Sequence, residues 1–224
     1  MIEKENTGLK LYLYERRFLI LLILCFTTLL VGSFIGDYHR LRYLFDLVVS
    51  VIFLSAMFAI VEKIRQLLIS ACLALPMLVA MWSNYLIESC ALAVIGEICG
   101  ILFFAYAIIH IVKHILKQEE VTKETIFAAL VIYMLSAYMW ARIYSFLEML
   151  QPGSFSMPAG NFFGDRLVFL YYSFVTITTL GYGDITPLTD KASALSIFEA
   201  ISGQIYLVVL VAWLVGMYVS KKSK

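Results

Sequence analysis

Six apolar stretches dominate this sequence, and each is close to the ~20 residues that a helix needs to cross a lipid bilayer. They cover residues 18–35, 44–61, 67–83, 86–112, 125–147 and 192–219. Hydrophobic residues make up 62% of the 224 residues, which is more than a soluble domain of this length could bury. The sequence therefore predicts an all-α membrane protein with six transmembrane helices.

Basic residues gather in the segments that one orientation of these helices places in the cytoplasm. They are Lys10, Arg16, Arg17, Lys63, Arg65, Lys113, Lys117, Lys221, Lys222 and Lys224. The positive-inside rule then predicts a multi-pass protein of the plasma (inner) membrane with both termini cytoplasmic. His39, Arg40 and Arg42 in the first outer loop run against this pattern. The first apolar run is longer than the core of a signal peptide, so we expect an uncleaved anchor.

One further apolar segment, residues 167–178, is too short to cross the bilayer. It lies between the last two spans on the predicted outer side, so we expect a re-entrant helix. Backbone that leaves helical geometry at membrane depth is tolerated only beside protein or a water-filled cavity, so the next residues should line a cavity. The chain thus divides into a four-helix domain, residues 1–118, and a second domain, residues 119–224. The second domain has an outer helix at 125–147, the re-entrant helix, a segment at 179–184 and an inner helix at 192–219.

The segment after the re-entrant helix is suited to holding a dehydrated cation. Its residues are Thr179, Leu180, Gly181, Tyr182, Gly183 and Asp184. A cation without its water shell needs several oxygens, and a backbone supplies one carbonyl per residue if successive residues turn inward. Gly181 and Gly183 meet that need because glycine enters left-handed conformations without steric cost. Four copies around an axis would turn these carbonyls into stacked rings of oxygens, with the Thr179 hydroxyl innermost.

Together with the aromatic run at 171–174 and the closing residues 185–187, this segment resembles the potassium-channel signature. Residues 119–224 are similar to the two-helix pore module of that family, and the whole chain to its bacterial six-helix, non-voltage-gated type. The resemblance implies a homotetramer with a potassium-selective filter. It places K⁺ at Thr179, Leu180, Gly181 and Tyr182, and puts Gly183 at the outer edge of the filter.

The resemblance also implies roles for residues around the filter. Asp184 would stand at the outer mouth, braced by the aromatic residue Tyr172, and Thr178 would support the filter from the end of the re-entrant helix. Val175 departs from the family pattern, because many relatives carry a glutamate at this position. The filter therefore lacks an acid on that side.

Gly203 in the inner helix lies twenty residues after Gly183, the offset at which related pores place a gating hinge. Close helix packing beside Ser202 is the alternative reason for a glycine there. Further along the helix, Val211, Val215 and Val219 could close the pore by dewetting a narrow apolar ring. Thr186 replaces an aromatic residue that would bind quaternary ammonium at the outer mouth, so we expect weak external block by such cations.

The fourth span has no cation between residues 91 and 112, where its only fully charged side chain is Glu97. Moving one charge through the membrane field is worth about 2.3 kcal/mol per 100 mV, so a helix without mobile cations has little to respond with. We therefore expect no steep voltage dependence.

Charged side chains within spans normally find partners. We expect Glu97 to pair with Arg142; the alternatives are a protonated Glu97 and an Arg142 that reaches the outer interface. Glu199 should face the re-entrant helix and bond to backbone or hydroxyl groups. His110 and His114 share one helix face at a spacing that suits a metal or a pH sensor, but two histidines without a third ligand favour ordinary interfacial residues.

The resulting expectation is a passive potassium channel, not an enzyme, with membrane lipid around it. No catalytic residues, no cofactor other than the transported K⁺, no nucleic-acid partner and no soluble ligand domain are expected. Two alternatives stay open: a silent regulatory subunit that assembles with other channel chains, and a less selective cation channel. An active transporter is disfavoured, because such relatives repeat the pore unit four times in one chain.

Overall fold

The computed structural model describes residues 16–35, 42–61, 63–83, 85, 87, 89–118, 120–157 and 164–222. The positions of Lys10, His39, Arg40 and Lys224, on which part of the predicted orientation rests, lie outside the described residues. In chain order the helices are α2 (Arg17–Ile35), α3 (Arg42–Ile60), α4 (Ile64–Ser83), α5 (Cys90–Leu116), α6 (Lys123–Leu150), α7 (Gly164–Ile177) and α8 (Asp190–Lys222). Two short strands, β1 (Phe155–Ser156) and β2 (Thr186–Pro187), complete the order.

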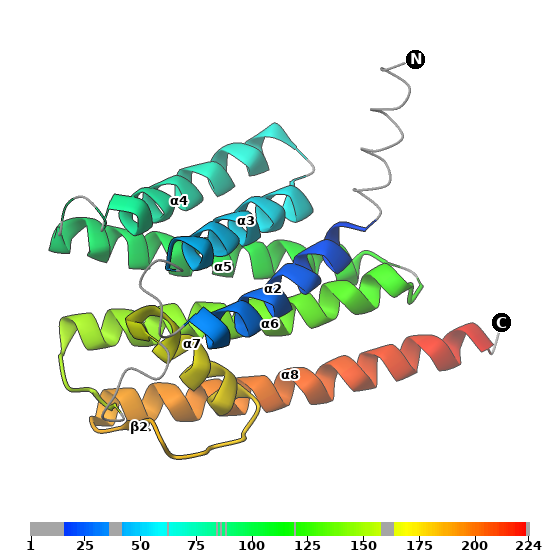
Figure 1. Ribbon diagram of the computed structural model, residues 1–224. Helices are drawn as coiled ribbons and strands as arrows, with labels where there is room; N and C mark the ends of the chain where they lie inside the picture. The colour runs from blue at the N-terminus through cyan, green and yellow to red at the C-terminus, as the bar shows by residue number, and fades with distance from the viewer. Residues whose placement is uncertain are drawn as a thin grey trace.

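Within the described residues, four helices are long and apolar enough to cross a membrane: α4, α5, α6 and α8. Helices α2 and α3 have 19 residues each, and the six-crossing topology stays a prediction for them. The chain runs back and forth along one bundle, so α2 begins and α8 ends at the same end of it (Figure 1).

Two helices begin at residues other than those predicted from hydropathy, because polar side chains cap their N-termini. Helix α5 begins at Cys90 and not at residue 86, because the Ser89 side chain accepts a hydrogen bond from the Leu92 N–H. Helix α6 begins before residue 125, because Thr122 and Thr125 form a reciprocal capping box. Hydropathy alone does not register these hydrogen bonds.

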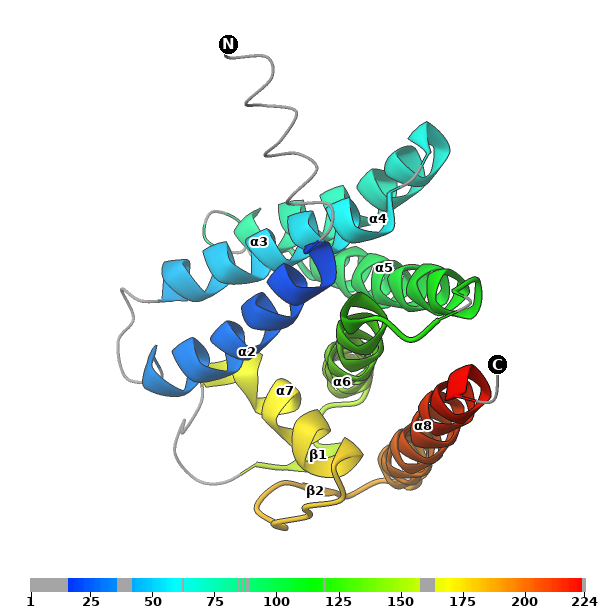
Figure 2. The same cartoon turned by 90° about the vertical axis from the view of Figure 1, so that its right-hand side faces the viewer.

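Helix α6 lies at the centre of the fold and contacts α2, α5, α7 and α8 (Figure 2). On the side of α6 that faces α2, the Tyr138 hydroxyl donates to the Cys25 carbonyl at 3.1 Å. The rings of Phe53, Phe103, Phe104 and Tyr138 pack together between α3, α5 and α6. Helices α2, α3 and α5 therefore share a core with α6.

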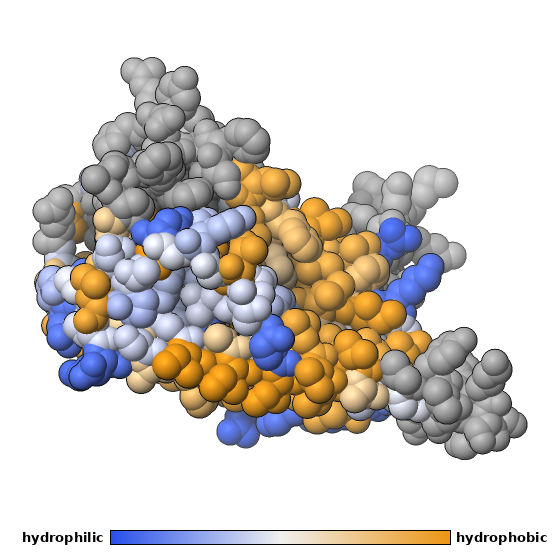
Figure 3. All heavy atoms as spheres, turned by 90° about the horizontal axis from the view of Figure 1, so that it is seen from below, coloured by the Kyte–Doolittle hydropathy of each residue, from blue (hydrophilic) through white to orange (hydrophobic). Residues whose placement is uncertain are grey.

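Helix α8 has the opposite character, because much of its apolar surface is uncovered within one chain. Its exposed large residues are Ile197, Phe198, Ile201, Ile205, Leu207, Val208, Val209 and Val211. Figure 3 shows a broad apolar surface, in orange, on this side of the molecule. Lipid or another subunit must cover a surface of this kind.

Candidate functional site

The segment after α7 has alternating backbone conformations. Thr179, Gly181 and Gly183 have φ angles of 59°, 59° and 77°, and no positive φ occurs at Leu180 or Tyr182 between them. In a regular strand successive carbonyls point to opposite sides, whereas left-handed residues at every second position turn them toward the same side. The segment thus has the backbone geometry that a row of inward carbonyls requires.

Thr179 is the one non-glycine residue with a positive φ in the described part of the chain. A β-branched side chain is strained in this region, typically by about 1–3 kcal/mol, and such strain persists only where the surroundings hold it. An observed outlier of this kind points to a functional constraint on residue 179.

Hydrogen bonds to the last turn of α7 hold the start of the segment. The Val175 carbonyl accepts from the N–H groups of Leu180 at 2.9 Å and Gly181 at 3.3 Å. Thr178 donates its hydroxyl to the Phe174 carbonyl at 2.6 Å. Val175 thus contributes its backbone oxygen, and its buried side chain adds no charge to this side of the segment.

Asp184 closes the segment and is held by Tyr171. The Tyr171 hydroxyl donates to Asp184 Oδ2 at 2.6 Å, and the Ile185 N–H donates to Asp184 Oδ1 at 3.0 Å. The prediction that Tyr172 braces this acid is wrong. Tyr172 is buried on the other side of α7, where its hydroxyl bonds to Ser196 Oγ of α8 at 2.7 Å. Successive residues of a helix point about 100° apart, so only one of two adjacent tyrosines can face Asp184.

Two short strands connect the residues that follow the segment to the residues that follow α6. Strands β1 and β2 pair antiparallel, with Ser156 opposite Thr186, and the Leu188 N–H donates to the Ser154 carbonyl at 2.8 Å. Glu148 of α6 accepts from the N–H groups of Gly153 and Phe155. Helix α7 and the returning segment therefore enter and leave at the same end of the bundle (Figure 1).

Glu199 of α8 is fully buried behind α7 and bonds to hydroxyl groups. The Tyr144 hydroxyl of α6 donates to Glu199 Oε2 at 2.5 Å, and the Ser173 hydroxyl of α7 contacts Glu199 Oε1. One carboxylate thus joins three helices. Sequence reasoning placed Glu199 against the re-entrant helix but did not identify Tyr144, Ser173 or Ser196; each is an ordinary polar residue on an apolar helix.

Gly203 lies where α8 crosses the end of α7. A Cβ atom there would lie 2.6 Å from Ile177 Cγ1 and 2.7 Å from the Ile177 carbonyl oxygen. The structure therefore shows close packing at Gly203, the alternative to a hinge, and α8 stays helical through this residue. Val211 is exposed, and the side chains of Val215 and Val219 lie outside the described part of α8.

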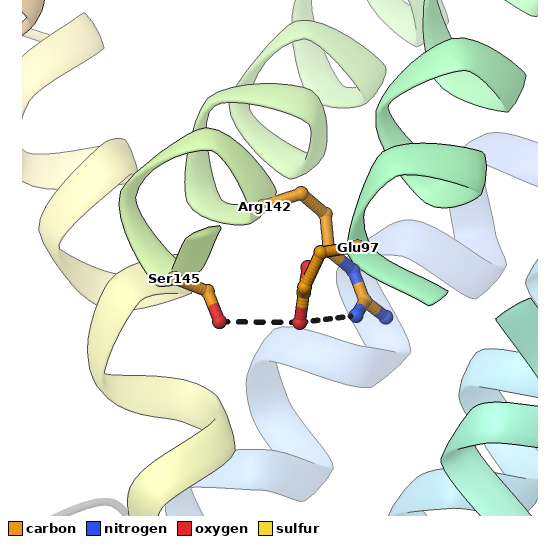
Figure 4. Close-up of polar contacts among 3 residues, drawn as sticks. All are labelled: Glu97, Arg142 and Ser145. Carbon is orange, nitrogen blue, oxygen red and sulfur yellow. Dashed lines mark hydrogen bonds and ion pairs between the residues drawn. The ribbon is translucent and has the colours of Figure 1, made fainter. Parts of the chain in front are cut away.

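Glu97 of α5 and Arg142 of α6 lie together (Figure 4). Arg142 Nη1 donates to Glu97 Oε1 at 3.1 Å, and Ser145 Oγ donates to the same oxygen at 3.1 Å. His110 and His114 have different partners: His110 Nδ1 is 2.9 Å from the Tyr106 carbonyl oxygen, and His114 contacts Arg17. No group of three metal-binding side chains occurs among the described residues.

A comparison with protein families matches residues 120–220 to the family described as ion channel. Comparisons with curated proteins and with solved structures found no significant match. The matched residues contain α6, α7, the segment with alternating conformations, and α8. The C-terminal part of this chain, residues 120–220, is thus similar to the ion channel family.

Proposed function

We propose that this chain is one subunit of a homotetrameric potassium channel that conducts K⁺ passively across the plasma (inner) membrane. Residues 179–183 are the selectivity filter in this proposal, with K⁺ bound at Thr179, Leu180, Gly181 and Tyr182. The observation that carries it is the left-handed backbone at every second residue of the segment. Both termini are cytoplasmic in this orientation, and the filter opens outward.

The surroundings of the filter support this assignment. All residues from Thr179 to Asp184 are exposed within one chain, although Leu180 and Tyr182 carry large apolar groups. A single row of carbonyls cannot surround an ion, whereas four rows around an axis can replace its hydration shell. Helix α7 ends at Ile177 just before the filter, and the partial negative charge at its C-terminus, about half an elementary charge, favours a cation there.

The function is tested by flux into liposomes that contain the purified full-length protein. We expect K⁺ uptake well above Na⁺ uptake and block of that uptake by Ba²⁺. Equal K⁺ and Na⁺ fluxes would instead indicate a less selective cation channel. Single-channel recording from the purified protein addresses the other alternative, because a silent regulatory subunit gives no current alone.

The filter assignment is tested with matched glycine variants. Gly181→Ala adds a methyl group at φ 59°, a strain of roughly 1–2 kcal/mol that should rotate the carbonyls away from the pore and abolish selective flux. Gly153→Ala is the control: Gly153 also has a positive φ, 82°, but lies in the turn before β1. Selective flux should survive in Gly153→Ala, and unchanged reversal potentials in Gly181→Ala would contradict the assignment.

A further inference from the structure

A cavity of about 320 Å³ lies among the helices, and its lining includes no residue of the segment 179–184. Helices α3, α4, α5 and α6 form its sides, and Phe169 and Leu170 of α7 form part of its wall. Asp46 lies near the start of α3, Ala93 near the start of α5 and Met149 at the end of α6, so the cavity lies at the bundle end where the filter segment returns. A volume of this size is within the range of small-molecule sites.

The charged side chains that line the cavity have a net negative charge. Its charged lining residues are Asp46, Glu97 and Arg142, so two carboxylates face one guanidinium. Asp46 is fully buried, and its Oδ2 accepts from the Tyr85 hydroxyl at 2.5 Å. A ligand with one positive charge would neutralise this lining, whereas an anion would be repelled by it.

One carboxylate oxygen of Glu97 has no hydrogen-bond partner among the described residues. Glu97 Oε1 accepts from both Arg142 and Ser145, whereas the buried Oε2 accepts no hydrogen bond from the part of the chain that the structure describes (Figure 4). A carboxylate oxygen away from water is unfavourable without a donor, so this atom requires an N–H or O–H group from whatever occupies the cavity.

Aromatic side chains form the apolar part of the lining. Phe53, Phe104 and Tyr138 all line the cavity, with ring centroids 5.0 Å apart between Phe53 and Phe104 and 5.9 Å apart between Phe104 and Tyr138. Such rings accommodate an apolar body and also attract a cation over their faces. A bare metal ion fits the lining less well, because the described residues hold no cluster of three metal ligands.

We propose that this cavity binds a small organic cation, a protonated primary amine on an aromatic or aliphatic body. The ammonium group donates to Glu97 Oε2 and lies in the field of Asp46, and the body packs against Phe53 and Phe104. This proposal concerns a second site in the chain and does not depend on conduction through the filter.

The test measures binding of 2-phenylethylammonium to the full-length protein in lipid nanodiscs by isothermal titration calorimetry. The neutral analogue 2-phenylethanol has a similar shape and lacks the charge, so it should bind at least tenfold more weakly. Glu97→Gln should weaken ammonium binding at least tenfold, and Ala93→Phe should abolish it by filling the cavity. Glu120→Gln removes an exposed acid outside the cavity and should leave binding unchanged.

Three results would overturn the proposal. They are no binding of the ammonium probe at millimolar concentration, equal binding of the neutral analogue, and ammonium binding that survives both Glu97→Gln and Ala93→Phe. If Glu97→Gln fails to fold because Arg142 loses its partner, Ala93→Phe still decides the question, since it leaves all three charged side chains in place. Loss of K⁺ flux in the same preparations would count against the proposed channel function and not against this site.

Discussion

Replacing Gly203 with alanine separates the two reasons for a glycine at this position. A Cβ atom would lie 2.6 Å from Ile177 Cγ1 and 2.7 Å from the Ile177 carbonyl oxygen, whereas ordinary contacts begin at 3.4 Å. The Ile177 side chain can move aside, but its carbonyl is main chain at the end of α7. Helices α7 and α8 must therefore move apart by about 1 Å to admit the methyl group.

The expected cost follows from this overlap. Overpacking of this kind typically destabilises a protein by about 1–3 kcal/mol. Alanine has a better helix propensity than glycine, which adds up to ~1 kcal/mol to the free energy of unfolding. The overpacking cost is larger, so we expect Gly203→Ala to lower the free energy of unfolding. For a chain of this size each kcal/mol lowers Tm by about 2–4 °C, which thermal unfolding monitored by tryptophan fluorescence can resolve.

A matched control exists in the same helix. A Cβ atom added at Gly216 would have no neighbour within 4 Å, so Gly216→Ala should keep or slightly raise Tm. Gly203→Ala should lower Tm and reduce selective K⁺ flux, because the shift reaches the end of α7 just before the filter. Adding Ile177→Ala should rescue only part of the loss, since the carbonyl clash remains.

A different outcome would refute the packing explanation. If Gly203→Ala unfolds at the temperature of Gly216→Ala and conducts normally, the two helices do not approach as closely as the structure indicates. If Tm is unchanged but channel opening is altered, Gly203 acts as a hinge.

Three further predictions concern the ion pair, the outer mouth and voltage. Reversing either Glu97 or Arg142 alone should lower Tm, because it leaves like charges in contact, and reversing both should restore it; failure of the double variant to recover would contradict the pairing. Tyr171→Phe removes one hydrogen bond to Asp184, an effect of about 0.5–1.5 kcal/mol, and should make K⁺ current less sustained, whereas unchanged current would argue against a bracing role. Conductance should vary little between about −100 and +100 mV, and a gating charge of several units would disprove the interpretation of α5 as a helix without voltage-sensing charges.

The four long apolar helices and the left-handed backbone at Gly181 and Gly183 could be predicted because their signals are local. An apolar run of sufficient length indicates a membrane helix, and two glycines at positions 181 and 183 indicate where left-handed backbone is allowed. The positive φ of Thr179 was not predicted, because no property of threonine favours it and only the repeat of the neighbouring conformations requires it.

Contacts between helices were harder to predict, because they depend on how each helix is rotated. Tyr171 and Tyr172 are chemically identical neighbours, and only the packing of α7 decides that the first meets Asp184 and the second meets Ser196. Ser145 also donates to Glu97, and this contact could not be predicted because it too depends on how α6 is rotated against α5.

The conformation of the proposed filter is formed within a single chain, although a single chain cannot complete an ion site. Its strain at Thr179, about 1–3 kcal/mol, is opposed by hydrogen bonds that all come from the same subunit, including those from Leu180 and Gly181 to the Val175 carbonyl. Leu180 and Tyr182, by contrast, are 56% and 67% exposed and have no cover inside the subunit. In the proposed tetramer, assembly would bury these side chains and bring four preformed rows of carbonyls together, so the cost of ordering the filter falls on subunit folding and not on ion binding.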